Sequence, residues 1–217
     1  MTARSRCFKK EVRLVGDPTK FGYLWEYYAF HIAFAFLLLS ELFIFFYTMR
    51  RGPRAQTAKG DHGTKWLLYG NFAVCLFVSI YSVSQAAPAL PRQLVFPPFA
   101  ADIGTAFIAA GIVIRLSAVL TLKKAFTLHV QTAAGQRLVT SGLYHTVRHP
   151  AYSGSILSLF GVALAFRNIA AVCLVPFCCL ICYGTRIQVE EKALEARFGK
   201  EYVDYKRGTY RLFPYIF

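Results

Sequence analysis

The stretch "YSGSILSLFGVALAFRNIAAVCLVPFCCLICYG", Tyr152–Gly184, is a long apolar block with Arg167-Asn168 at its middle. As one α-helix it would run to about 50 Å, whereas the hydrocarbon core of a membrane is about 30 Å thick. We therefore expect two shorter helices that turn at Arg167-Asn168 and form a hairpin embedded in the membrane. Gly161 and Pro176 are expected to let this hairpin bend or pack closely.

Three more apolar segments precede this block. Each has the roughly 20 apolar residues that a membrane-spanning helix needs: Tyr27–Met49, Trp66–Ala87 and Phe99–Leu122. The proline-rich connection Pro88–Pro98 predicts a tight loop between the second and the third. Together with the hairpin, these segments predict an all-α integral membrane protein with about five membrane helices.

The composition supports a membrane protein over a nucleic-acid-binding one. The chain has 217 residues, 56% of them hydrophobic, and a formal net charge of +14. Such a positive balance is often a sign of nucleic-acid binding. Here, however, Lys and Arg gather between the apolar blocks, which is the pattern of membrane proteins. We therefore expect contact with membrane lipid and none with nucleic acid.

The basic residues also indicate an orientation. The loop between the second and third helices carries Arg92 alone, whereas the other connections and the C-terminal tail carry several Lys and Arg each. The positive-inside rule then places the tail in the cytosol. An odd number of helices puts the basic start of the chain on the other side, against the same rule, so the N-terminal orientation stays open.

The start of the chain and the cysteines predict neither a cleavable signal peptide nor a metal site. "MTARSRCFKKEVRLVGDPTK" has no apolar core, so no cleavable signal peptide is expected. Cys179 and Cys182 form a CxxC motif, but no second pair or histidine cluster completes a zinc site. We expect buried, apolar cysteines and no metal.

The connection "LVTSGLYHTVRHPAYSG", Leu138–Gly154, is polar although apolar blocks flank it. Gly142 permits a turn, and Pro150 restrains His149 toward extended geometry. Tyrosines, arginine and histidine add hydrogen-bonding groups and aromatic faces. Taken alone, this composition is equally typical of a helix end at the membrane surface.

The tail "RIQVEEKALEARFGKEYVDYKRGTYRLFPYIF" predicts an amphipathic helix that ends at Gly199. Arg186 and Glu190 lie one helical turn apart, so they share a face and can pair. The planar fork of an arginine suits a carboxylate ligand, and a glutamate can face a cationic one. A solvated acidic pair, Glu190 and Glu191, is the plainer interpretation.

Together, the connection, the "RN" turn, the tail and the final "FP" resemble the isoprenylcysteine carboxyl methyltransferase family over residues 126–217. The ending "YRLFPYIF" is similar to fungal members. The resemblance implies a membrane enzyme of the endoplasmic reticulum. Such an enzyme methylates the C-terminal carboxylate of prenylated proteins with S-adenosyl-L-methionine.

The resemblance also implies roles for particular residues. Arg186 would contact the substrate carboxylate, Asn168 would have a structural role, and Gln136 stands where the family has a histidine. Arg186 and Glu190 would carry the catalysis. The cofactor pocket would comprise Gln131, Gln136, Arg137, Leu138, Val139, Tyr144, His149, Pro150, Ala151, Tyr152 and Glu190.

We accordingly expect a basic segment over residues 1–26, three transmembrane helices over 27–122 and a catalytic region over 123–217. The prenyl chain is expected to enter between helices, where small residues leave room, namely Gly104, Ala109, Ala110 and Gly111.

Two alternatives remain open. Methylation of a phospholipid or other lipid amine would need a base such as Glu191 or His149, because an amine must lose a proton before attack. A non-catalytic scaffold or transporter could use Asp102 and Arg115 as a polar path. The same two charges are also explained by bonding between helices.

Overall fold

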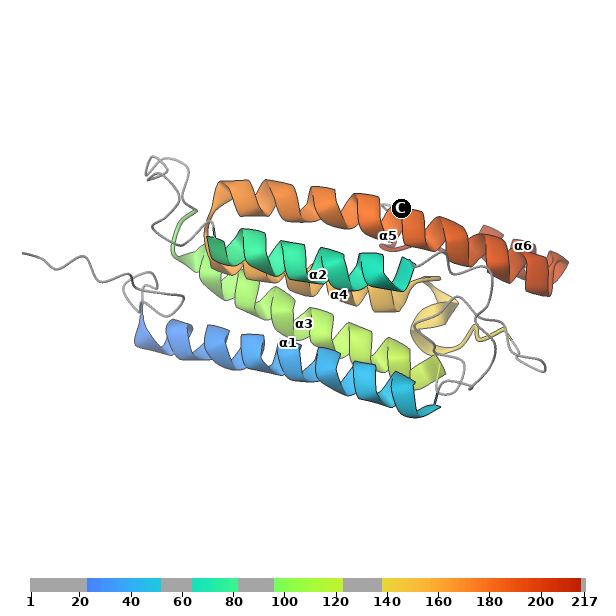
Figure 1. Ribbon diagram of the computed structural model, residues 1–217, viewed down its shortest axis with the longest axis horizontal. Coiled ribbons are helices and arrows are strands. Elements are labelled where there is room, and N and C mark those ends of the chain that lie inside the picture. Colours follow the sequence, from blue (N-terminus) through green and yellow to red (C-terminus); the bar gives the residue numbers. More distant parts are fainter. Residues whose placement is uncertain (1–22, 52–63, 82–95, 123–137, 216–217) are drawn as a thin grey trace, which may run out of the picture.

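The computed structural model describes residues 23–51, 64–81, 96–122 and 138–215. Five long helices lie side by side in a bundle, and a short 3-10 helix and a short α-helix pack at one end (Figure 1). The helices are α1 (Leu24–Arg51), α2 (Thr64–Tyr81), α3 (Phe99–Leu122), η4 (Gly142–His145), α4 (Pro150–Ala165), α5 (Ile169–Phe198) and α6 (Lys200–Arg207). The predicted all-α class is confirmed.

The predicted hairpin is also confirmed, and two residues account for its turn. Arg167 has a positive φ of 59°, and its Nε donates a hydrogen bond to the Phe96 carbonyl at 2.7 Å. Asn168 caps α5, because its Oδ1 accepts from the backbone N–H groups of Ala170 at 2.9 Å and Ala171 at 3.3 Å. An asparagine cap satisfies N–H groups that have no partner within the helix. The turn therefore forms where apolar sequence gives way to Arg-Asn.

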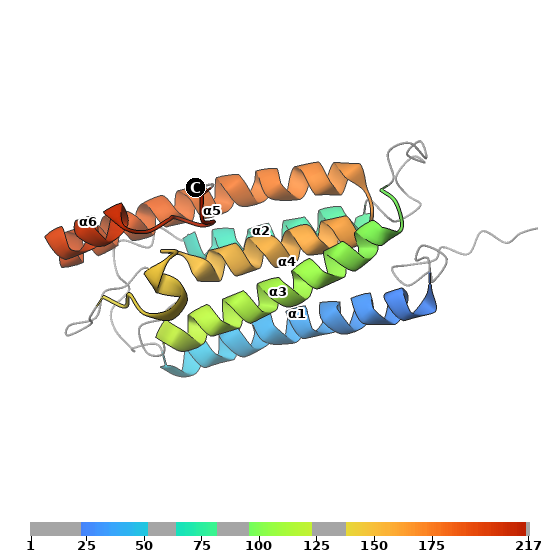
Figure 2. The same cartoon turned by 180° about the vertical axis from the view of Figure 1, so that it is seen from behind.

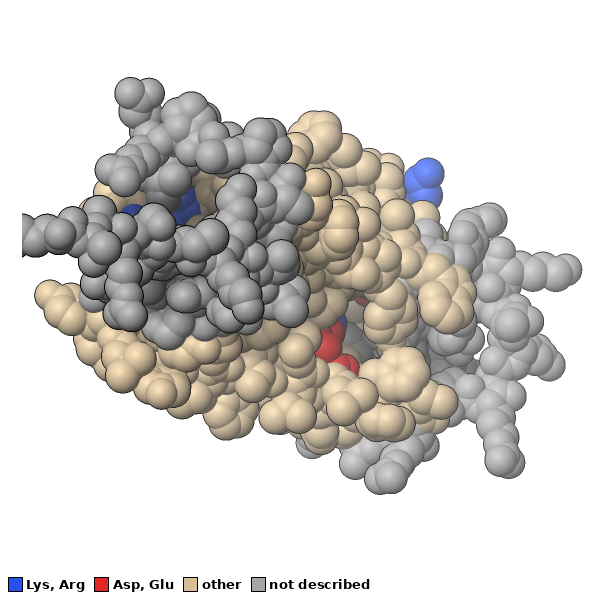
Figure 3. All heavy atoms as spheres, turned by 60° about the vertical axis from the view of Figure 1, so that its left-hand side comes forward, with Lys and Arg blue, Asp and Glu red and all other residues tan. Residues whose placement is uncertain are grey.

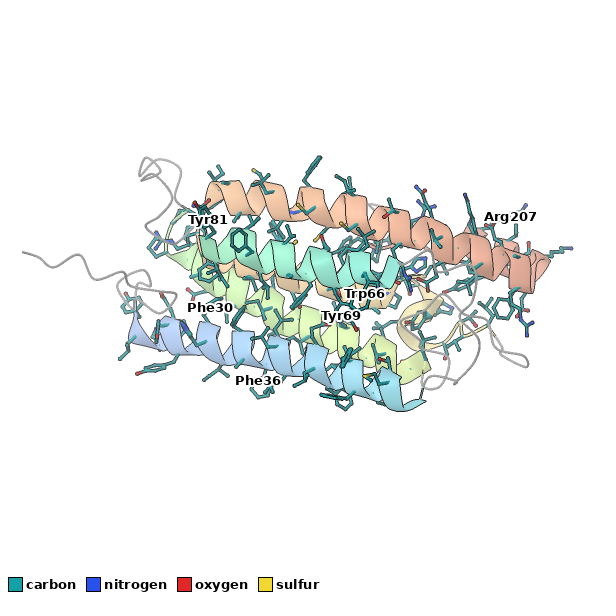
Figure 4. All side chains as sticks on the ribbon, in the orientation of Figure 1. Phe30, Phe36, Trp66, Tyr69, Tyr81 and Arg207 are labelled. Carbon is teal, nitrogen blue, oxygen red and sulfur yellow. The ribbon has the colours of Figure 1, made fainter. Side chains whose placement is uncertain are left out.

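The outer surface of the bundle is apolar. Phe36 on α1 is 60% exposed and points away from the other helices, whereas Phe30 on the same helix is 1% exposed and points inward (Figure 4). In the face that Figure 3 shows, Lys, Arg, Asp and Glu of the described residues reach the surface in few places, notably in a hollow between other residues.

By length and composition, Leu24–Met49, α3 and α5 can each cross a membrane, whereas the apolar helices Trp66–Tyr81 and α4 are shorter. The chain is a multi-pass membrane protein. The predicted end of the second helix, Ala87, lies outside the described residues.

Helix α5 joins two segments that the sequence analysis treated separately. It continues through Gly184, covers 30 residues and ends before Gly199, the predicted terminator, which has a φ of 54°. At 1.5 Å per residue it is about 45 Å long, so it is longer than a hydrocarbon core of about 30 Å. Its last turns and α6 extend beyond the other helices, at the end of the bundle opposite the start of α1 (Figures 1 and 2).

Helices α3 and α4 approach closely through glycines. A Cβ atom at Gly111 would lie 2.2 Å from the Ser158 Oγ and 2.5 Å from the Gly154 carbonyl oxygen. A Cβ at Gly104 would lie 2.6 Å from the Gly161 carbonyl oxygen. The predicted close packing at Gly161 is therefore confirmed. The expectation that Gly104 and Gly111 leave room for a prenyl chain is wrong, because the backbone of α4 fills that space.

Arg115 of α3 joins three helices. Its Nη2 donates to Glu41 Oε2 of α1 at 2.8 Å, and its Nη1 donates to the Ala151 carbonyl of α4 at 3.2 Å. Bonding between helices thus accounts for this charge, with Glu41 as a partner that the sequence analysis did not select. Asp102 lies about 20 Å away along the same helix, so it does not share this contact.

The glycine packing gives a stability prediction. Gly111→Ala should lower the unfolding temperature in detergent, because overpacking of a close helix contact costs about 1–3 kcal/mol. Gly70→Ala is the matched control, since a Cβ at Gly70 of α2 meets no atom of the described residues within 4 Å. Circular dichroism on heating measures both variants. An unfolding temperature for Gly111→Ala equal to that of Gly70→Ala would contradict the packing role.

Candidate active site

The hydroxyl of Tyr152 links the two residues that the sequence analysis placed at the site. Tyr152 Oη donates to Glu190 Oε2 at 2.7 Å and accepts from Arg186 Nε at 3.2 Å. Tyr152 lies in the first turn of α4, and Arg186 and Glu190 lie one turn apart on α5. The hairpin therefore brings a cation, a hydroxyl and a carboxylate together at one place.

Two aromatic neighbours hold the Tyr152 ring. The His149 ring stacks on it at a centroid distance of 5.7 Å and an angle of 13°, and the Tyr183 ring lies at 5.3 Å and 45°. His149 and Tyr183 are both buried. The ring is thereby restrained from both helices of the hairpin, which limits where its hydroxyl can point.

The charges of the site differ in their exposure. Arg186 is only 2% exposed, whereas Glu190 is half-buried. A buried guanidinium is costly without hydrogen-bonding partners, so its position and orientation are restricted. An arginine is chemically complementary to an anionic group, and a glutamate is complementary to a cationic one. The arrangement therefore suits two ligands, or two parts of one ligand, of opposite charge.

Glu191 has a different environment from Glu190. It is 5% exposed, and its Oε1 lies 3.1 Å from Arg148 Nε and 3.2 Å from His149 Nε2. Its Oε2 lies 3.2 Å from Arg211 Nη2 and 3.8 Å from Lys206 Nζ. The interpretation of Glu190 and Glu191 as a solvated acidic pair is therefore wrong for Glu191, which is buried among cations. Its ion pairs also make it a poor candidate for a base.

The C-terminal segment docks onto the Arg-His-Pro connection. The backbone N–H of Arg148 donates to the Tyr210 carbonyl at 2.8 Å, and that of His149 donates to the Arg211 carbonyl at 3.1 Å. Ser153 Oγ donates to the Leu212 carbonyl at 2.5 Å. His149 was predicted to be part of the cofactor pocket. Arg148 was not predicted as an anchor, because no short-range pattern links it to the tail.

Tyr144 lies beneath this tail. It is 6% exposed, and its backbone carbonyl accepts a hydrogen bond from Tyr205 Oη at 2.6 Å. Burial raises the pKa of Tyr205 to about 12, so this hydroxyl stays protonated at neutral pH and donates. Burial, followed by the nearby Glu190 charge, also raises the pKa of Tyr144.

The remaining predicted residues have other surroundings. Pro150 and Ala151 are buried at the start of α4, and Leu138 and Val139 are half-buried before η4. Gln131, Gln136 and Arg137 lie outside the described residues. The structure thus brings together His149, Tyr152, Arg186 and Glu190, and the pocket roles of all the predicted residues stay predictions.

Comparison with known proteins gives a family match for the central part of the chain. The model of the isoprenylcysteine carboxyl methyltransferase family matches residues 104–196, which include Tyr152, Arg186 and Glu190.

Several named relatives are similar over much of the chain. A probable protein-S-isoprenylcysteine O-methyltransferase of Oryza sativa is 28% identical over 173 residues, which cover 71% of this chain and 91% of the relative. The protein-S-isoprenylcysteine O-methyltransferase of Schizosaccharomyces pombe is 26% identical over 211 residues, which cover 89% and 88%. That of Xenopus laevis is 33% identical over 118 residues, which cover 52% and 40%.

A solved structure shares the fold. It is the eukaryotic intramembrane Ras methyltransferase, an isoprenylcysteine carboxyl methyltransferase, with a TM-score of 0.55 and 24% identity. The match covers 89% of this chain and 63% of the solved chain. Residues 104–196 thus match the model of the isoprenylcysteine carboxyl methyltransferase family, and the chain is similar to named members of that family in sequence and in fold.

Proposed function

We propose that this protein methylates the C-terminal carboxylate of prenylated cysteine in proteins, with S-adenosyl-L-methionine as the methyl donor. The observation that carries the proposal is the Tyr152 hydroxyl, which joins Arg186 to Glu190 where the α4–α5 hairpin meets the tail. Residues 123–217 are the proposed catalytic region, after the three helices within 27–122 and the basic segment 1–26. The endoplasmic reticulum membrane is the proposed location, with the tail in the cytosol.

The charges at the site fit the methyl donor. S-adenosyl-L-methionine has a cationic sulfonium and an amino-acid end with both an ammonium and a carboxylate. The half-buried Glu190 is suited to a cationic part, and Tyr144, His149 and Tyr152 would add aromatic faces. Leu138 and Val139, with Gln131, Gln136 and Arg137, are the other proposed contacts, whereas Pro150 and Ala151 would shape the start of α4. When bound, the donor supplies a methyl group on a positively charged sulfur.

The acceptor needs no base from the protein. A peptide carboxyl group has a pKa of about 3.3–3.7 and is already ionised at neutral pH. The residues must instead position it, and Arg186 is the proposed contact because its planar fork can bind both carboxylate oxygens. Tyr152 restrains the guanidinium, and His149 and Tyr183 restrain Tyr152. Catalysis then rests on alignment in a partly dehydrated site.

A transfer assay separates this proposal from the alternatives. Membranes that contain the protein are incubated with radiolabelled S-adenosyl-L-methionine and either N-acetyl-farnesylcysteine or phosphatidylethanolamine. We expect label in the farnesylcysteine product only. Label in phosphatidylethanolamine alone would indicate a lipid amine methyltransferase, and label in neither would indicate a non-catalytic role.

Arg186→Lys tests the carboxylate contact. Lysine keeps the charge but lacks the planar fork, so kcat/KM for N-acetyl-farnesylcysteine should fall about 10- to 100-fold, as expected for the loss of a charged hydrogen bond. The affinity for S-adenosyl-L-methionine should stay within about threefold of wild type. Arg207→Lys is the matched control, because Arg207 is on α6 with its side chain 78% exposed. Unchanged turnover of Arg186→Lys would exclude this role.

Glu190→Gln tests the donor contact. The amide is isosteric but neutral, so the Kd for S-adenosyl-L-methionine in calorimetry should rise about tenfold or more through loss of a charged contact. Glu201→Gln removes an equally charged but exposed side chain from α6 and should bind like wild type. An unaltered Kd for Glu190→Gln would remove Glu190 from the donor site.

A further inference from the structure

Tyr202 of α6 carries a buried hydroxyl that the site described above does not use. The residue is 1% exposed, and among the described residues its Oη has no hydrogen-bond partner. Buried polar atoms in native proteins are nearly always satisfied, and an unsatisfied hydroxyl is destabilising. Such an atom beside a binding site therefore points to a ligand.

The position of Tyr202 relates this hydroxyl to the site. Its helix, α6, reaches the residue next to Glu190, because Lys206 Nζ, one turn after Tyr202, lies 3.8 Å from Glu191 Oε2. Tyr205, three residues later, offers a direct contrast, because its hydroxyl is used within the protein to bond the Tyr144 carbonyl. The two rings are in contact at a centroid distance of 5.9 Å. The hydroxyl of Tyr205 thus has a hydrogen-bond partner within the described part of the protein, whereas that of Tyr202 has none there.

The chemistry of the hydroxyl defines what it can bind. Burial, followed by the charges of Glu191 and Glu190, raises the pKa of Tyr202, so the group is a neutral O–H donor at physiological pH. Glu190 is the proposed contact for a cationic part of the methyl donor. In an amino acid the carboxylate is separated from the ammonium by a single carbon, so an oxygen acceptor would lie close to that cation.

We propose that the Tyr202 hydroxyl donates a hydrogen bond to the α-carboxylate of the methyl donor, beside Glu190. This assignment rests on the proposed function. Tyr202 then makes α6 part of the donor site, so that the C-terminal tail binds ligand as well as packing against the hairpin.

Calorimetry on purified full-length Tyr202→Phe tests the proposal with two probes. S-adenosylhomocysteine has the amino-acid end, whereas 5′-methylthioadenosine lacks it and keeps the nucleoside. We expect the affinity for S-adenosylhomocysteine to fall about 10- to 100-fold, the range of a lost hydrogen bond to a charged group. The affinity for 5′-methylthioadenosine should stay within about twofold of wild type.

Thermal unfolding without ligand separates binding from a structural role. Tyr202→Phe removes an unsatisfied group, so its unfolding temperature should equal or exceed that of wild type. Tyr205→Phe, the matched control, removes a satisfied hydrogen bond and should unfold at a lower temperature, with an unchanged ratio of the two affinities.

Three results would overturn the proposal. Wild-type affinity of Tyr202→Phe for S-adenosylhomocysteine would exclude the contact while the proposed function stands. An equal loss for both probes would exclude the amino-acid end as the group bound. A wild-type protein that binds neither probe would overturn the proposed function and this contact together.

Discussion

The buried carboxylate of Glu191 is the constraint on which the rest of the site depends. A carboxylate that is 5% exposed must be neutralised, and Arg148, His149, Lys206 and Arg211 provide the surrounding positive and hydrogen-bonding groups. These partners come from the connection before α4, from α6 and from the final segment. The ion pairs and hydrogen bonds that compensate the buried charge of Glu191 therefore also hold the tail against the hairpin. Once the tail is closed, His149 has a defined position, and the Tyr152 ring stacks against it.

Packing between the membrane helices fixes the position of the residues that begin this site. The glycines of α3 and α4 let the two backbones approach, and Arg115 adds a polar link from α3 to Glu41 and to the Ala151 carbonyl. The latter contact is on the residue before Tyr152. The packing of α3 on α4 thus holds the first turn of α4, where the polar site begins.

Much of this architecture could be predicted from local sequence. Apolar length predicted the bundle, the Arg-Asn interruption predicted the hairpin, and Gly199 predicted the end of α5, because each depends on neighbouring residues. The spacing of Arg186 and Glu190 predicted a shared face for the same reason. The continuity of α5 through Gly184 was missed, since a single glycine does not stop a helix that packs against neighbours along its length.

The sequence by itself determined that the chain crosses a membrane as helices, that the last apolar block folds back on itself, and that Arg186 and Glu190 lie together. Only the tertiary structure decided the roles of Tyr152, Glu191 and Tyr202. Adjacent glutamates look alike in sequence, yet one is half-buried beside a tyrosine hydroxyl and the other is buried among cations. The physical reason is that burial and charge pairing depend on segments distant in the chain, whereas helix formation depends on neighbours along it.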